Sequence, residues 1–347
     1  MRSDCTTEQN DVARRQSRRG RKESLMRKKS PLARFLTDNG MYIVMALVFV
    51  YFAVSAPGFL TANNIARIPL QSAFVILIAT GMTMVIITGG IDLSVGSVVA
   101  FTAVVFSLIL KQYAVAVPLA ILGALIAGST SGAFVGFFIV KFRVPPFIAT
   151  LAMMTIARGL ARLFAQNSKI FIENPAIEKY SDFIMIKEIA ITSAIGVPYL
   201  VVLMLAVVVF LGLVLMKTRF GRYVTATGGN EEATKLSGVN VNQVKFMVYV
   251  INAFLAAVVG VMMASKFMNG NPEFGVMWEL DAIAACVVGG TSLMGGKGNI
   301  FKTLFGALLI GMLDNGLLAQ GRSSEMIYII KGIIILGAVI IDQVKEK

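Results

Sequence analysis

Residues 84–101 read MVIITGGIDLSVGSVVAF, which places a Gly-Gly pair and one carboxylate, Asp92, between two apolar runs. A glycine inside a helix costs about 1 kcal/mol relative to alanine, so clustered glycines predict a helix break. An acid at the centre of a lipid-facing span costs roughly 2.5–3.5 kcal/mol on insertion scales, so Asp92 is expected to face a bundle interior or a cavity. The stretch therefore predicts two membrane helices separated by an irregular turn.

The composition of the whole chain is that of a membrane protein. Hydrophobic residues make up 56% of the 347 residues and charged residues 15%, with a mean hydropathy of +0.77. Soluble domains carry about 25% charged residues. Several apolar runs approach the roughly 20 residues that cross a bilayer. These values exclude a soluble fold and predict an all-α polytopic membrane protein.

Apolar runs that are separated by polar residues, prolines or glycines predict about ten transmembrane helices. Their approximate bounds are 41–57, 70–88, 95–111, 114–139, 146–165, 197–216, 246–266, 279–293, 300–318 and 325–342. Residues 1–37, ahead of the first run, contain eleven Lys or Arg residues against four acids. By the positive-inside rule, we expect residues 1–37 to form a basic cytoplasmic tail. Residues 38–347 would form the transmembrane domain, with a cytoplasmic loop at 217–245 and a cytoplasmic C-terminus.

The residues that enzymes and metal sites use most often are scarce. The chain has no histidine, and its two cysteines are Cys5 and Cys286. Histidine is the commonest metal ligand and general base, so neither a metal site nor a catalytic site is expected. More than half of the net charge of +13 lies in the tail, a pattern of membrane orientation that does not indicate nucleic-acid binding.

The segment 123–136 reads GALIAGSTSGAFVG and repeats glycine every four residues, at Gly128, Gly132 and Gly136. Small residues at this spacing let helix backbones approach closely in a membrane, where lipid gives no hydrophobic drive for packing. The pattern predicts an architectural contact between helices.

The Gly-Gly break has an echo two hundred residues later. Residues 89–96 and 289–296 share the pattern GGxxLxxG, although it is short and the chain has 32 glycines, so chance remains an alternative. Paired Gly-interrupted segments in two halves of a transporter indicate discontinuous helices around a central pathway. On this interpretation the substrate pathway includes Gly89, Gly90, Asp92, Ser94, Asp281, Thr291 and Ser292. Alternatively, Asp92 and Ser94 only cap the helix that begins near Val95.

The inner loop 217–245 contains a predicted short helix. Asn230 is its expected N-cap, Glu231 and Glu232 lie in its first turn, Lys235 lies near its end, and Gly238 ends it. A rigid, exposed helix has no role in a simple pore and suits a partner that pushes on it. The chain has no G-x-x-x-x-G-K-[ST] phosphate loop, so any ATP is expected on another chain.

Four segments carry a family resemblance. They are GGIDLSVGS (89–97), TRFGRYVTATGGNEEATKLSGVNV (218–241), ELDAIAACVVGGTSLMGGKG (279–298) and IIKGIIILGAVIID (329–342). Together, and in this order, they resemble the permease subunits of ribose-type ABC sugar importers, over nearly everything from about residue 40 onward. The resemblance implies a type II ABC importer-like permease fold for 38–347 in a bacterial cytoplasmic (inner) membrane.

The same resemblance implies partners and a coupling loop. The partners are a cytoplasmic ATP-binding-cassette subunit, a periplasmic sugar-binding protein, a second permease copy in a homodimer, and membrane lipid, with no nucleic acid. No cofactor is implied for this chain, and ATP and Mg would bind the partner ATPase. The residues matching the family's ATPase-docking loop are Gly228, Gly229, Asn230, Glu231, Glu232, Ala233, Lys235, Leu236, Ser237 and Gly238.

The leading hypothesis is therefore a permease subunit that translocates a monosaccharide, namely a ribose-like pentose, a hexose or a polyol. An ion-coupled secondary transporter of a small polar solute, or a passive pore, is the alternative, and several convergent in-membrane acids would favour it. A membrane enzyme would need a nucleophile and base or a metal cluster. The residues leave open which sugar is carried and whether the permeases pair as a homodimer or a heterodimer.

Overall fold

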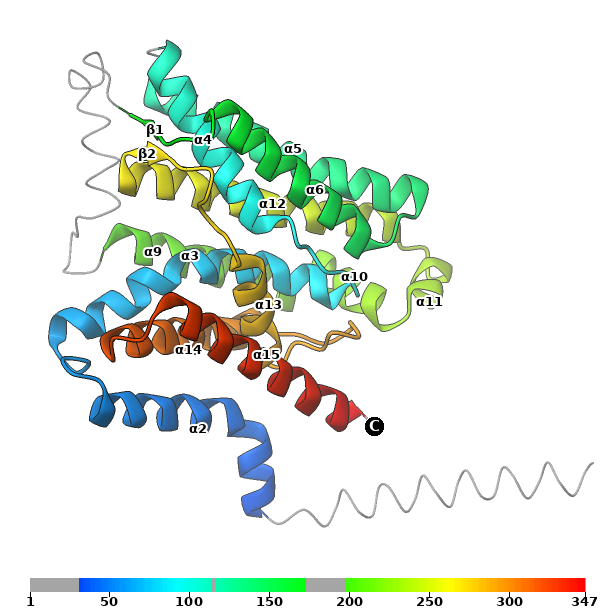
Figure 1. The fold of residues 1–347 in the computed structure, drawn as a ribbon. Helices are drawn as coiled ribbons and strands as arrows, with labels where there is room; N and C mark the ends of the chain where they lie inside the picture. The colour runs from blue at the N-terminus through cyan, green and yellow to red at the C-terminus, as the bar shows by residue number, and fades with distance from the viewer. Residues whose placement is uncertain (1–30, 114–115, 173–197, 347) are drawn as a thin grey trace, which may run out of the picture. The chain divides into compact units, whose positions relative to one another are not determined.

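The computed structural model describes residues 31–113, 116–172 and 198–346 (Figure 1). Residues 1–30, most of the predicted basic tail, lie outside the described residues. The chain divides into two units, Met1–Leu47 and Val48–Lys347, and all packing reported below lies within the second. The elements, in order, are α2 (Pro31–Ser55), α3 (Ala62–Ile87), α4 (Val95–Tyr113), α5 (Val117–Phe142), α6 (Pro146–Phe164), β1 (Ile170–Phe171), α9 (Tyr199–Lys217), α10 (Arg219–Gly229), α11 (Glu231–Leu236), α12 (Val241–Phe267), β2 (Asn269–Gly270), α13 (Trp278–Val288), α14 (Ile300–Ala319) and α15 (Ser324–Glu346).

The all-α membrane architecture is confirmed. Within the described residues, seven helices are long and apolar enough to cross a bilayer, namely α3, α4, α5, α6, α9, α12 and α14. A shorter apolar stretch, Gly40–Ser55, lies in α2, and α15 has 23 residues. The β1 and β2 strands form a single two-residue antiparallel pair, Ile170 with Gly270 and Phe171 with Asn269.

Two expected boundaries need correction. The predicted span 279–293 is α13, which has only 11 residues and ends at Val288. At 1.5 Å per residue it is about 16 Å long, roughly half of the hydrocarbon core, so it does not cross the membrane as a helix. The expected loop 217–245 is largely helical, because α10 fills its first half and α12 begins at Val241 instead of near residue 246.

Both Gly-Gly pairs end a helix in the same way. After α3, the Gly89 N–H donates to the Ile86 carbonyl at 2.9 Å and the Gly90 N–H to the Val85 carbonyl at 3.1 Å. After α13, Gly290 and Thr291 repeat these two bonds on Val287 and Cys286, at 2.8 and 2.9 Å. This is the Schellman motif, which needs a left-handed residue just past the helix. Gly89 (φ +79°) and Gly290 (φ +82°) supply it.

The left-handed residue of the Schellman motif occupies a different position of the GGxxLxxG pattern in each segment. The left-handed residue is the first glycine of the pair in one segment and the second in the other. The GGxxLxxG echo therefore marks two similar helix ends, displaced by one residue, and not a residue-by-residue structural repeat.

The helices of the second unit form two groups (Figure 1). α12 packs on α4 and α5, and α4 packs on α6, while α3 packs on α9, α13 and α14; contact between α12 and α3 joins the groups. The predicted glycine contact lies in the first group, because a Cβ at Gly128 would overlap Ala257 and Thr102, and one at Gly132 would overlap Ala253 and the Tyr249 carbonyl. These glycines therefore let α5 approach α12 closely.

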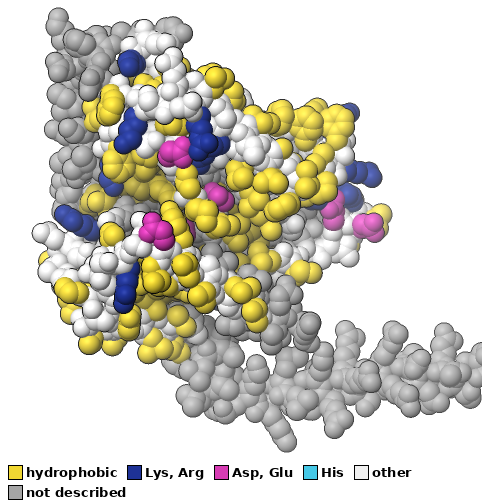
Figure 2. All heavy atoms as spheres, in the orientation of Figure 1, with side chains coloured by type: hydrophobic (Ala, Val, Ile, Leu, Met, Phe, Trp, Pro, Cys, Tyr) yellow, Lys and Arg dark blue, Asp and Glu magenta, His cyan; other side chains and the backbone are white. Residues whose placement is uncertain are grey.

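Figure 2 shows apolar side chains over much of one face of the helices, with basic and acidic side chains both near the end that carries α11 and on the opposite side of the view. Large exposed apolar residues occur on the spans, including Leu119, Ile126, Phe210 and Leu318. Apolar surface of this kind suits contact with lipid. The functional features described next lie around α10 and α11 and between the two helix groups.

Candidate functional site

The predicted short helix in the inner loop is α11, and its capping is confirmed. The Asn230 Oδ1 accepts from the Ala233 N–H at 2.9 Å, and Gly238 follows with φ +82°. Glu231 pairs with Lys235 at 2.6 Å, one turn away, and with Lys245 of α12 at 2.5 Å. Partial burial raises the pKa of the Glu231 carboxyl, but the two lysines outweigh this and hold it below its usual value.

The outer face of α11 is unusually apolar at one position. Leu236 is 90% exposed, the largest exposed fraction among the large apolar side chains of the described residues. Thr234 is buried beneath the helix, so α11 has one side fixed against the protein and one side free. α11 is thus a capped helix that is held on one side and exposes one leucine on the other.

Glycines bring the end of α10, which leads into α11, against both helix breaks. A Cβ at Gly228, in the last turn of α10, would overlap the Ile87 carbonyl oxygen and lie 2.6 Å from the Gly296 nitrogen. The Gly296 N–H itself donates to the Ile87 carbonyl at 2.8 Å. We call Ile87, Gly228, Gly295 and Gly296 the glycine junction. It connects the end of α3, the end of α10 and the loop 289–299 by direct backbone contact.

Asp92 is 1% exposed and bonds within the protein. Its Oδ1 accepts from the Ser94 N–H at 2.9 Å and the Ser94 hydroxyl at 2.6 Å, at the start of α4. Its Oδ2 accepts from the Asn252 amide of α12 at 2.8 Å. Both bonds to Oδ1 come from Ser94, which precedes α4, and Asn252 ties this turn to α12, a contact that sequence reasoning missed. The Tyr249 hydroxyl, close to Gly90, is buried without a hydrogen-bond partner among the described residues.

Thr291 and Ser292 lie in the second break, and both are buried. The Ser292 N–H donates to the Lys297 carbonyl at 3.0 Å, and its hydroxyl accepts from the Met294 N–H at 3.3 Å, which closes the loop into a compact turn. The Thr291 hydroxyl has no hydrogen-bond partner among the described residues. Gly89 lies beside this turn, since a Cβ at Gly295 would be 3.1 Å from the Gly89 nitrogen. The structure therefore brings the two breaks together.

Asp281 belongs to a separate, buried ion network that joins α13, α14 and α15. Lys331 of α15 lies 3.0 Å from Asp281 of α13 and 2.8 Å from Asp314 of α14. Asp281 and Lys331 are 6% and 8% exposed. Sequence reasoning named Asp281 as a pathway residue and missed Lys331. The available signal was the rule that ionisable groups inside a membrane pair with one another.

Arg158 and Glu279 mark a further region of polar contacts. Arg158 of α6 donates to the Pro272 and Phe274 carbonyls at 2.5 and 2.9 Å, holding the segment that leads into α13. The Glu279 carboxylate lies against Gly96, where a Cβ would be 2.5 Å from Oε2. Glu279 forms no ion pair with any described residue. Of the three acids on α13 and α14, it is thus the one without a cationic partner at bonding distance.

Comparison with known proteins identifies relatives over most of the chain. The profile of a family described as "Branched-chain amino acid transport system / permease component" matches residues 64–339. The ribose import permease protein RbsC of Escherichia coli (strain K12) is 40% identical over 315 residues, which cover 90% of this chain and 95% of the relative. RbsC of Bacillus subtilis (strain 168) is 39% identical, covering 88% and 93%. The L-arabinose transport system permease protein AraH of Escherichia coli (strain K12) is 33% identical, covering 90% and 93%. No solved structure matches this chain.

Proposed function

This chain belongs to the permease family of the branched-chain amino acid transport system, and on that premise we propose that it is the membrane-spanning subunit of an ATP-binding-cassette importer for a monosaccharide. Similarity to ribose and arabinose permeases over about 90% of the chain supports a sugar over an amino acid. The proposed location is a bacterial inner membrane with both termini in the cytoplasm. A homodimer of this chain, a periplasmic sugar-binding protein and an ATPase subunit complete the transporter.

One observation carries the coupling mechanism. The last turn of α10, which leads into α11, contacts the backbone of both helix breaks at the glycine junction. We propose that the ATPase docks on the segment Gly228–Gly238, with Leu236 as the apolar anchor. ATP and Mg bind that partner, and this chain binds no cofactor. A displacement of α11 moves the last turn of α10, which touches the Ile87 carbonyl and the Gly296 nitrogen. Backbone packed without an intervening side chain transmits such a movement directly to both helix breaks.

Replacing Leu236 with Asp tests the docking surface. We expect ATPase capture from mild-detergent membranes to fall at least about tenfold, because a central apolar anchor contributes on the order of 2 kcal/mol to an interface. The thermal unfolding midpoint of the permease should not change, since Leu236 is 90% exposed. The conservative Leu236→Met variant should retain capture. Equal capture by Leu236→Asp and wild type would place the ATPase contact elsewhere.

The substrate pathway is proposed to pass between the two helix groups, along the two breaks. Gly89, Gly90, Asp92, Ser94, Thr291 and Ser292 shape its inner part, and Asp281 supports α13 beside it. Most of these polar groups already bond within the protein, so their proposed role is to hold the backbone that the sugar passes. Glu279 has no such bond to a neighbouring cation, and a carboxylate accepts hydroxyl hydrogens well. We propose that Glu279 binds sugar hydroxyls in transit.

Replacing Glu279 with Gln tests this role. A hydrogen bond to a charged group contributes about 1.5–3 kcal/mol, so half-maximal uptake should require at least about tenfold more sugar. Uptake is measured in vesicles containing the complete transporter, supplied with ATP and the sugar-binding protein. Glu273→Gln is the matched control, because Glu273 is exposed and pairs with Arg162. An unchanged uptake curve for Glu279→Gln would exclude this carboxylate from the path without affecting the assignment of the ATPase dock.

A further inference from the structure

Two polar atoms on one face of α12 are buried without a hydrogen-bond partner among the described residues. They are the Tyr249 hydroxyl and the Asn252 Oδ1, in residues that are 1% and 0% exposed. The two residues are three positions apart, so they lie one turn apart on the same face of the helix. Most buried polar groups in proteins are hydrogen-bonded, so a neighbouring pair without partners calls for an explanation.

This face of α12 meets the end of α3 and the first helix break. A Cβ at Gly90 would overlap the Tyr249 hydroxyl, and a Cβ at Gly81 would overlap the Asn252 Oδ1. The Asn252 amide also donates to the Asp92 Oδ2 at 2.8 Å. The contact joins the two helix groups, because α12 belongs to one group and α3 to the other. Both atoms therefore lie where the substrate pathway is proposed to pass.

The hydrogen-bonding character of the pair narrows the class of ligand. The Asn252 Oδ1 only accepts, whereas the Tyr249 hydroxyl both donates and accepts. Neighbouring hydroxyls of a sugar or polyol satisfy both atoms at once. A metal cation fits less well, because the Asn252 N–H that donates to Asp92 Oδ2 would point its positive end at the ion. Glu279 lies against Gly96 in the first turn of α4, so a further acceptor lies at the other side of the same break.

We propose that Tyr249 and Asn252 form the α12 side of the substrate pathway and bind neighbouring hydroxyls of the sugar when α12 separates from the first break. This inference rests on the proposed function and adds two contact residues to it. In this structure the glycines close the contact, so the two polar atoms face Gly90 and Gly81. Separation of α12 from α3 exposes these atoms and gives them the partners that they lack in the closed contact.

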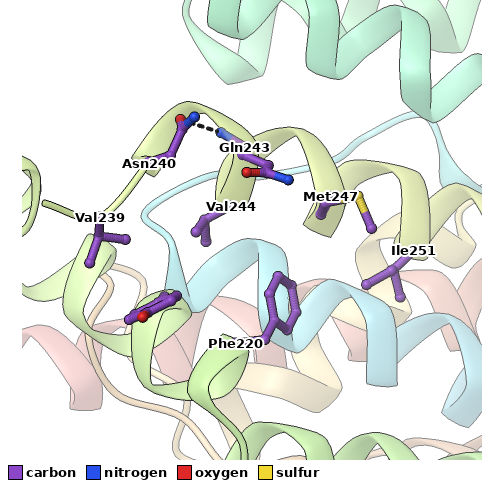
Figure 3. Close-up of a pocket in the computed structure, with 8 residues that line it drawn as sticks. Phe220, Val239, Asn240, Gln243, Val244, Met247 and Ile251 are labelled. Atoms are coloured by element: carbon purple, nitrogen blue, oxygen red, sulfur yellow. Dashed lines mark hydrogen bonds between the residues drawn. The ribbon is translucent and has the colours of Figure 1, made fainter.

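The opposite face of α12 has space for such a movement. A groove of about 410 Å³ lies between α10 and the first turns of α12. Figure 3 shows Phe220 of α10 facing Met247 and Ile251 of α12 across the open space. At about 100° per residue, the groove residues and the Tyr249–Asn252 pair lie on opposite sides of the helix. A helix that is closely packed on only one face shifts more readily than one that is enclosed on both.

Replacing Tyr249 with Phe tests the proposal. The variant deletes one hydroxyl that has no partner among the described residues, so the thermal unfolding midpoint should not fall. Half-maximal uptake should require about threefold to tenfold more sugar, because one hydrogen bond to the sugar is lost. Uptake of D-ribose and of L-arabinose is measured in vesicles containing the complete transporter, supplied with ATP and the sugar-binding protein.

Thr102→Val is the matched control. The Thr102 hydroxyl is also buried without a partner among the described residues, but it lies against Gly128 of α5, within one helix group. The control therefore deletes an equivalent hydroxyl away from the pathway. It should keep both the midpoint and the uptake curve of wild type.

Three results would overturn the inference and leave the proposed function in place. The first is an unchanged uptake curve for Tyr249→Phe. The second is an uptake loss that accompanies a lower midpoint, or that Thr102→Val shares, because either would show a structural role. The third is a wild-type midpoint that rises in sodium chloride but not in choline chloride, with no rise in Tyr249→Phe, which would assign the site to a cation. A wild type that transports neither sugar would contradict the proposed function itself.

Discussion

Replacing Gly228 with alanine is expected to reduce ATP-driven uptake at least about tenfold. The added methyl group would overlap the Ile87 carbonyl oxygen and lie 2.6 Å from the Gly296 nitrogen, at the hydrogen bond between those two groups. Overpacking of this kind costs about 1–3 kcal/mol, and the atoms that the methyl group would meet belong to the backbone and cannot rotate away. The end of α10 must then move off the helix breaks. The ATPase should still bind, because Leu236 and the rest of α11 are unchanged. The variant should therefore capture the ATPase as wild type does while its uptake falls.

The next residue provides the matched control. A Cβ at Gly229 meets nothing within 4 Å, so Gly229→Ala adds the same methyl group to the same turn of α10 without a collision. Because Gly229 also lies in the proposed docking segment, ATPase capture by this variant is measured alongside; with capture unchanged, its uptake should equal that of wild type in the same vesicles. If the two variants transport equally well, the glycine junction does not carry the coupling movement, and the contact between α10 and Ile87 is only a packing contact.

Replacing Lys331 with methionine is expected to be the most destabilising single change in the membrane domain. Lys331 is the shared partner of Asp281 and Asp314, at 3.0 and 2.8 Å. Removing one partner of a buried ion pair costs about 3–5 kcal/mol, because an uncompensated charge remains in the interior. The thermal unfolding midpoint in detergent should fall by at least about 5 °C, with a lower yield from membranes.

The compensating variant distinguishes charge from packing. Combining Lys331→Met with Asp281→Asn and Asp314→Asn removes all three charges and should restore most of the lost midpoint, since neutral groups of similar shape carry a smaller desolvation cost. Lys302→Met, on the exposed side of the first turn of α14, should leave the midpoint unchanged. A triple variant as unstable as Lys331→Met would show that the lysine stem, and not its charge, stabilises α15.

The coupling helix shows how much of this site was predictable from sequence. Asn230, Glu231, Lys235 and Gly238 lie within nine residues, and the cap, the first-turn acids and the left-handed glycine are all local features. The exposure of Leu236 was not predictable, because a leucine at the end of a short capped helix is as often buried as exposed. Likewise, Asp281 and Glu279 look alike in the sequence, and only the position of Lys331 on a distant helix separates the paired acid from the one without a cation.

The sequence by itself determined the membrane class, most of the spans and the caps of α11, because these follow from apolar length and from hydrogen bonds between residues a few positions apart. Tertiary structure alone decided which ends meet. Ile87 and Gly296 are joined by a hydrogen bond across two hundred residues, and Gly228 fits between them because it has no side chain. Such contacts depend on how whole helices pack, and no local pattern of residues encodes that distance. The physical reason is that capping is satisfied within one turn, whereas close backbone approach requires three separate segments to be placed at once.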